Sequence, residues 1–92
     1  MLKEEKQNVL EKAVNTFGEN LQLIKAIEEL GELSTALARV FTKEEAPAIN
    51  LFEEIADVEI MLEQLKIIYK DDAEKIERLK EMKLNRLKGL VW

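Results

Sequence analysis

Two short acidic motifs carry the side chains of this chain that are best suited to chemistry. Residues 28–32 read Glu-Glu-Leu-Gly-Glu, and residues 53–57 read Glu-Glu-Ile-Ala-Asp. In each motif carboxylates stand three residues apart, so a helix would place them on nearly the same face, one turn apart. Two such pairs brought together would offer four carboxylates to a hard divalent cation. A metal site is therefore the first hypothesis.

The chain contains neither histidine nor cysteine. Without them there is no imidazole or thiolate for zinc, and no Glu-x-x-His arrangement of the kind that di-iron helical bundles use. A metal would have to be held by oxygen atoms, which favours magnesium, manganese or calcium. The lack of cysteine also excludes a disulfide scaffold and fits a reducing cytoplasm.

The acidic residues differ in how they lie relative to the apolar faces of the expected helices. At about 100° per residue, Glu54 falls inside an apolar arc and Asp57 at its edge. Glu29 and Glu32 lie at or just beyond the edge of the arc of the preceding helix. The arc around Glu54 consists of Leu51, Ile55, Val58, Met61, Leu62, Leu65 and Ile68. A carboxylate on a core-facing side is costly unless it is paired or bound to a metal, so these four are the expected ligands.

The other charges near the motifs have simpler interpretations. Glu53 fits a capping box with Asn50 as the helix N-cap. Glu28 lies furthest from the apolar arc, and both an outer-shell ligand and a solvent-facing residue remain open. Lys25, one turn before Glu29, is a candidate partner that would neutralise carboxylates without a metal. One lysine balances four acids poorly, so a metal is favoured.

Composition and periodicity predict one all-α domain spanning residues 1–92. The chain is 47% hydrophobic and has one proline and three glycines, and a domain this small has a limited core. We expect an antiparallel four-helix bundle-like protomer whose core is completed by homo-oligomerisation. The expected helices cover about residues 2–17, 20–41, 50–70 and 73–90, with Gly18 ending the first, a loop over 42–50 containing Pro47, and Asp71 or Asp72 capping the last. Gly31 interrupts the second helix, which suggests close packing or approach of a ligand.

Charge is unevenly distributed along the chain. The net charge of −5 argues against nucleic-acid binding. Residues 73–92 carry +3, however, so residues 1–72 carry −8. The basic segment is either a solvated helix that complements an acidic body or a set of cations facing a polyphosphate. The sequence from Met1 to Lys6 has no apolar leader and no run approaches a membrane span, so we expect no membrane association and a cytoplasmic location.

The two motifs and their surroundings resemble the MazG-like all-α nucleoside triphosphate pyrophosphohydrolases, especially the short phage and bacterial forms. That family shares Glu-Glu-x-x-Glu followed, after a spacer, by Glu-x-x-Asp. The resemblance covers most of the chain from Phe17 to Lys88. It implies magnesium, with manganese as an alternative, bound by Glu29, Glu32, Glu54 and Asp57. It also implies that Glu29 orients or deprotonates the attacking water, with Glu28 supporting this catalytic residue.

The resemblance further implies hydrolysis of a nucleoside triphosphate, or its deoxy form, to the monophosphate and pyrophosphate, in nucleotide-pool control. Near the chain end, a basic residue and an asparagine approach the nucleotide in several relatives. The expected substrate-binding residues are Lys25, Lys83, Asn85, Arg86 and Lys88, although Gly89-Leu90 replaces the tyrosine-proline that follows in some members. The expected assembly is a homodimer or homotetramer. Two alternatives stay open: a relative restricted to dUTP, dCTP or phosphoribosyl-ATP, and a non-catalytic helical interaction module that keeps the fold.

Overall fold

A computed structural model describes residues 1–42 and 49–92, and the expected loop around Pro47 lies largely outside these described residues. The described chain is all-α, as predicted. It consists of α1 (Lys3–Phe17), α2 (Glu19–Thr42), α3 (Ile49–Ile68), the short 3₁₀ turn η1 (Lys70–Asp72) and α4 (Ala73–Val91). No strand occurs in these parts of the chain.

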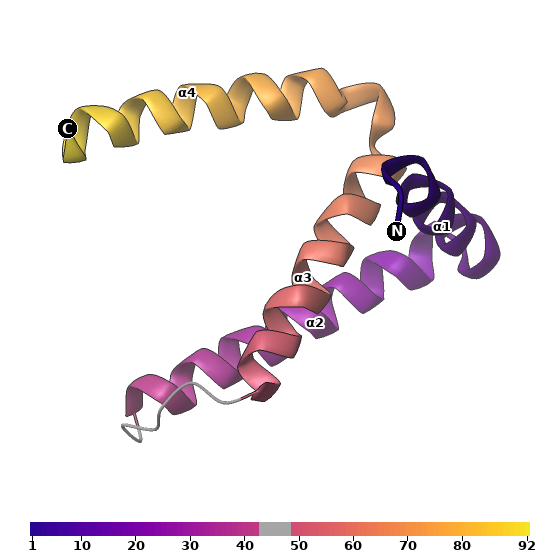
Figure 1. Ribbon diagram of the computed structural model, residues 1–92, viewed down its shortest axis with the longest axis horizontal. Helices are drawn as coiled ribbons and strands as arrows, with labels where there is room; N and C mark the ends of the chain where they lie inside the picture. The colour runs from indigo at the N-terminus through magenta and orange to yellow at the C-terminus, as the bar shows by residue number, and fades with distance from the viewer. Residues whose placement is uncertain (43–48) are drawn as a thin grey trace.

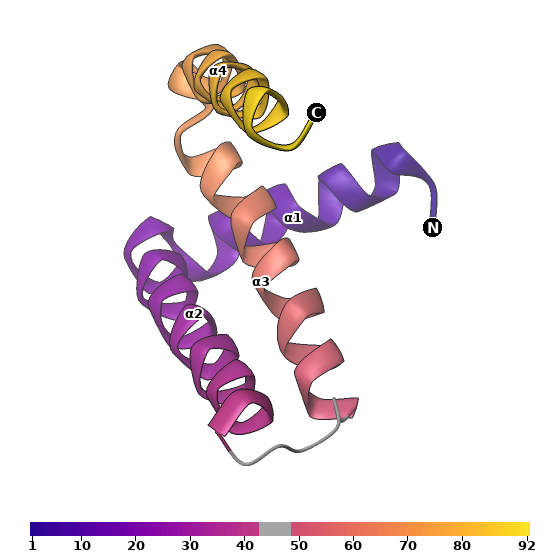
Figure 2. The ribbon, with the colours of Figure 1, turned by 90° about the vertical axis from the view of Figure 1, so that its left-hand side faces the viewer.

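Gly18 ends α1 as the sequence predicts. Its φ of 88° lies in the left-handed region, where glycine avoids the steric cost that a Cβ would bring. The Gly18 N–H donates a hydrogen bond of 2.8 Å to the Val14 carbonyl and closes the helix. Because α2 begins at the next residue, the chain turns sharply here, and α1 crosses one end of the body (Figure 2).

The body of the molecule is an antiparallel pair formed by α2 and α3, with α1 packed across it (Figure 1). The side chains buried between these helices are mostly small or medium in size. Among the described residues the buried apolar set is Val14, Ala26, Ala36, Leu51, Val58 and Met61. Three polar side chains, Gln22, Glu29 and Gln64, are buried with them. The core is therefore small and unusually polar for its size.

Ile24, Ile27, Leu30 and Leu37 recur at helical spacing along α2, and this spacing predicts that they form its core-facing stripe. In the structure these four side chains are 45–71% exposed. The sequence prediction for this side of α2 is therefore wrong within one chain, because α3 packs instead against the neighbouring face that carries Gln22, Ala26, Glu29 and Ala36.

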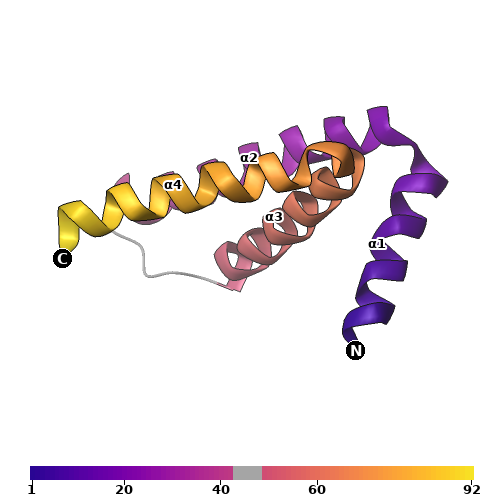
Figure 3. The same ribbon diagram turned by 90° about the horizontal axis from the view of Figure 1, so that it is seen from above.

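Helix α4 leaves the body after η1 and extends away from the α2–α3 pair (Figure 1), so that the two termini lie at opposite ends of the molecule (Figure 3). Its packing is chiefly against η1, and an ion pair of 3.7 Å between Lys66 and Glu77 ties its first turns to α3. Asp72 occupies the N-cap position, as predicted, without a side-chain cap hydrogen bond. The described chain thus has a three-helix body and a projecting fourth helix, and a four-helix bundle is not confirmed.

Candidate metal centre

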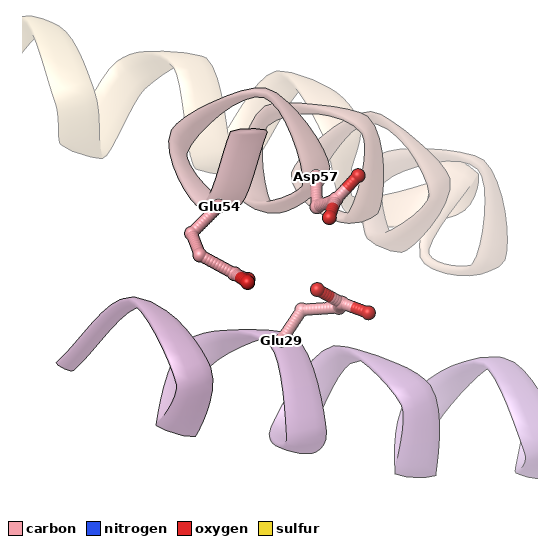
Figure 4. A group of neighbouring side chains, drawn as sticks. All are labelled: Glu29, Glu54 and Asp57. Carbon is pink, nitrogen blue, oxygen red and sulfur yellow. The ribbon is translucent and has the colours of Figure 1, made fainter. Parts of the chain in front are cut away.

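The acidic motifs meet where α2 and α3 pack together. Glu29 projects from α2, and Glu54 and Asp57 project from α3 toward it (Figure 4). Each of the three offers one carboxylate oxygen, and these oxygens all lie within 4.8 Å of one another. Glu54 and Asp57, which follow Glu29 by 25 and 28 positions in the sequence, come close to it because α2 and α3 pack antiparallel.

Glu29 and Glu54 occupy positions in the helix–helix seam that apolar residues would ordinarily fill. The α2 residues in this seam recur every three or four positions, and so do the α3 residues that form its other side. This is the spacing of a packed helix face. The α2 series is Gln22, Ala26, Glu29, Leu33 and Ala36, and the α3 series is Leu51, Glu54, Val58, Met61 and Leu65. The carboxylates are thus built into the packing surface rather than onto its rim.

The burial of these carboxylates leaves two oxygens without partners. Glu29 is only 5% exposed, Glu54 is half-buried and Asp57 is exposed. The Oε2 atoms of Glu29 and Glu54 are both shielded from solvent and accept no hydrogen bond from the described residues. A buried carboxylate oxygen with no donor is costly, and a divalent cation between the carboxylates would remove that cost.

Lys25 supplies part of the compensating charge, as the alternative without metal requires. Its Nζ lies 3.0 Å from Oε1 of Glu29 and 3.9 Å from Oε2 of Glu28. A hydrogen bond to Glu29 and the negative charge of that residue raise the pKa of Lys25. Lys25 therefore holds Oε1 of Glu29, whereas Oε2 has no partner among the described residues.

Glu32, the fourth expected ligand, lies beside Glu54 at the edge of the three-carboxylate cluster. Burial raises the pKa of the Glu54 carboxyl above its ordinary value, and the negative charge of the neighbouring Glu32 raises it further. Glu29 and Asp57 add to the same repulsion. The other three acids that the sequence singled out therefore all act on the Glu54 carboxyl.

A groove of about 510 Å³ runs beside the cluster, between α2 and the start of α3. It is lined by three acids, Glu28, Glu32 and Glu54, and by Gly31, Arg39 and Asn50 among others. Glu28 lines the groove and is not one of the three clustered carboxylates. Sequence reasoning missed Arg39, although its spacing of seven residues from Glu32 places it on the same side of α2.

Two expectations about the groove change with the structure. Helix α3 starts at Ile49, so Asn50 lies inside its first turn and lines the groove, and the prediction that it is the N-cap is wrong. At Gly31 an added Cβ would meet no atom within 4 Å. Close packing therefore does not explain that glycine, whereas approach of a ligand remains a reason for it.

The expected substrate-binding residues of the C-terminal segment lie elsewhere. Lys83, Asn85, Arg86 and Lys88 are exposed on α4, whose packing is against η1 rather than against the helices that carry the cluster. One chain as described does not bring these side chains to the acidic residues. Of the expected substrate-binding set, only Lys25 is adjacent to the cluster.

The donor set fits an oxygen-preferring cation. Three carboxylates from two helices, with a fourth beside them, are the kind of ligands that Mg²⁺ and Mn²⁺ accept, and an incomplete protein shell is usual where a phosphate substrate supplies further oxygens. Comparison of the chain with models of protein families, with curated proteins and with solved structures gives no significant match. Among the described residues, no helix is both long enough and apolar enough to cross a membrane.

Proposed function

We propose that the protein is a magnesium-dependent pyrophosphohydrolase of the MazG-like class, which converts a nucleoside triphosphate or its deoxy form to the monophosphate and pyrophosphate. The observation that carries the proposal is the pair of buried carboxylate oxygens, on Glu29 and Glu54, that have no partner in the seam between α2 and α3. The motif resemblance supplies the reaction, which geometry alone does not specify.

The residues around the cluster have distinct parts in this proposal. Glu29, Glu54 and Asp57, with Glu32 beside them, would hold the cation, which when bound neutralises phosphate charge and lowers the pKa of water. Lys25 fixes Glu29 through the 3.0 Å ion pair and so orients the carboxylate that positions the attacking water. Water adds to the α-phosphorus, the bond from that phosphorus to the bridging oxygen breaks, and pyrophosphate leaves with a proton released to solvent.

The proposal includes a homo-oligomer, dimer or tetramer, for which the exposed apolar residues are the support. Ile27 on α2 is 71% exposed, and Leu84 and Leu87 on α4 are each 50% exposed. A helix of 19 residues that packs only at its base has little stability of its own. The +3 charge of residues 73–92 complements the acidic remainder of the chain. A second copy would cover these stripes and could bring the cations of α4 to an acidic cluster.

The test is pyrophosphate release from a panel of nucleoside triphosphates with and without Mg²⁺. The panel includes dUTP, dCTP and phosphoribosyl-ATP, which identify a substrate-restricted enzyme. Glu29→Gln and Asp57→Ala should each lower turnover at least about a hundredfold, because each removes a group that holds the cation. Glu53→Gln is the matched control, since that exposed carboxylate belongs to the same motif but lies outside the cluster.

Two results would contradict the proposal in different ways. If no substrate releases pyrophosphate while the folded protein still binds Mg²⁺, the chain is a binding module and not a hydrolase. If turnover survives both substitutions in the cluster, the site assignment is wrong even though the activity is present.

A further inference from the structure

The groove beside the carboxylate cluster continues past the metal centre toward the end where α2 stops and α3 starts. Glu32 and Glu54 form its acidic part, and Arg39 and Asn50 line it as well. Its volume of about 510 Å³ exceeds what a single cation with its waters would need. The groove therefore has room for a ligand that extends from the cluster to Arg39.

Arg39 is the one cationic side chain among the described residues that line this groove. It lies one turn from the end of α2, and its side chain is exposed. No described acidic residue lies within ion-pair distance of it, whereas Lys25 is held by Glu28 and Glu29. The guanidinium is thus a planar donor group set beside the acidic cluster, and such groups match phosphate oxygens in pairs.

We propose that Arg39 binds the β- and γ-phosphates of the substrate, that is, the pyrophosphate that leaves, while the carboxylate cluster acts at the α-phosphate. The inference rests on the proposed function, because it assigns the direction in which the triphosphate of that substrate lies along the same groove. A triphosphate carries several negative charges past three groove-lining carboxylates, so it needs a cation beyond the metal centre. Arg39 is placed to supply that charge and to stabilise the leaving group.

A purely structural role for Arg39 makes a different prediction. A cation in the last turn of a helix also interacts favourably with the partial negative charge at the helix C-terminus. Lysine would serve that role as well as arginine, and losing it would lower thermal stability without changing affinity for phosphate. Paired donation to phosphate needs the arginine fork, which lysine does not have.

The experiment measures calorimetric binding of inorganic pyrophosphate to the full chain in saturating Mg²⁺. Arg39→Gln should weaken binding about tenfold to a hundredfold, the usual size for losing a hydrogen-bonded charge. Arg39→Lys should fall between that variant and the unmodified protein. The matched control is Lys12→Gln, which removes an exposed cation of α1. Affinity for Mn²⁺ alone, measured on the same proteins, should be unchanged in all three variants.

The outcomes separate this inference from the hydrolase proposal. Equal pyrophosphate affinity in Arg39→Gln and the unmodified protein would overturn the role of Arg39, whether or not triphosphates are hydrolysed. No pyrophosphate binding by the unmodified protein would overturn it too. Binding that depends on Arg39, in a protein that hydrolyses no triphosphate, would support the phosphate site and sink the hydrolase proposal instead. A lowered melting temperature with unchanged affinity assigns Arg39 to the helix terminus.

Discussion

The seam between α2 and α3 and the outer faces of α2 and α4 reverse the usual distribution of polar and apolar residues. The seam buries Gln22, Glu29 and Gln64, whereas Ile27 and Leu84 on the outer faces remain half-exposed or more. A chain that folded only to bury apolar surface would place the leucines and isoleucines inside. This reversal is what the two proposals address: a ligand in the seam, and a second chain on the outer faces.

The largest effect should come from the outer faces. Introducing charge on α4 with Leu84→Glu and Leu87→Glu together should convert the proposed oligomer to monomer, because two leucines buried in its interface would contribute roughly 1.5–3 kcal/mol each. Light scattering during gel filtration measures the mass directly. A charge-matched control, Gln7→Glu with Asn15→Glu, places the same charges on exposed positions of α1.

If the unmodified protein is already a monomer, a second chain does not explain the exposed outer faces of α2 and α4. The exposed stripes would then need another explanation, and α4 would be expected to fray in hydrogen exchange.

The next effect concerns the seam and the cation proposed to bind there. Mg²⁺ or Mn²⁺ at about 100 times its dissociation constant should stabilise the fold by about 2.7 kcal/mol, seen as a rise in melting temperature that chelator reverses. Asp57→Ala should abolish this rise, whereas Glu53→Gln should keep it, because only Asp57 belongs to the cluster. A metal-dependent rise that persists in Asp57→Ala would place the cation elsewhere.

These two regions also differ in how well the sequence predicted them. The 3.6-residue period predicted four helices to within a few residues. Gly18 marked the end of α1, because the backbone conformation at that position favours glycine over other residues. The cluster of Glu29, Glu54 and Asp57 followed from their positions near apolar arcs. Periodicity does not say which of two adjacent faces meets which helix, so the outward stripe of α2 and the projection of α4 were not foreseen. Arg39 was missed for the same reason, since the groove exists only once α3 is placed.

A smaller effect is expected where the seam buries a neutral polar pair. Gln22 Nε2 donates a hydrogen bond to Gln64 Oε1, and the two side chains are 7% and 6% exposed. Gln64→Leu leaves the Gln22 amide buried without its partner and should destabilise the fold by about 1–3 kcal/mol. The double variant Gln22→Leu with Gln64→Leu should recover most of that loss, as urea unfolding would show. If the double variant is no more stable than Gln64→Leu, the seam needs the glutamines for shape and not for pairing.

At Glu54 the expected effect is smaller still, because this side chain is only half-buried. The pKa of Glu54 is raised in the folded state. At pH values between the unfolded pKa, about 4.3, and the folded pKa, the folded state therefore binds more protons than the unfolded state. Without metal, stability should therefore fall as pH rises through that window. Glu54→Gln should flatten this dependence and raise the melting temperature of the metal-free protein, while losing the stabilisation by Mg²⁺. Thermal melts across pH with chelator present test this, and an unchanged slope in Glu54→Gln would contradict the repulsion inferred from the cluster.

Gly31 gives the smallest effect and tests whether the groove side of α2 is shaped for a ligand. A Cβ there meets no atom within 4 Å, and the residue is inside a helix, so Gly31→Ala should stabilise the fold by about 0.5–1 kcal/mol. The same methyl group projects into the groove beside Glu32, so pyrophosphate affinity and turnover should fall as stability rises. Gly18→Ala is the contrasting control, because at a φ of 88° the added Cβ should cost stability and leave the groove unchanged. If Gly31→Ala is more stable and binds pyrophosphate with unchanged affinity, the ligand does not approach the backbone at Gly31. The ligand would then contact this part of the molecule only at the carboxylates of the cluster.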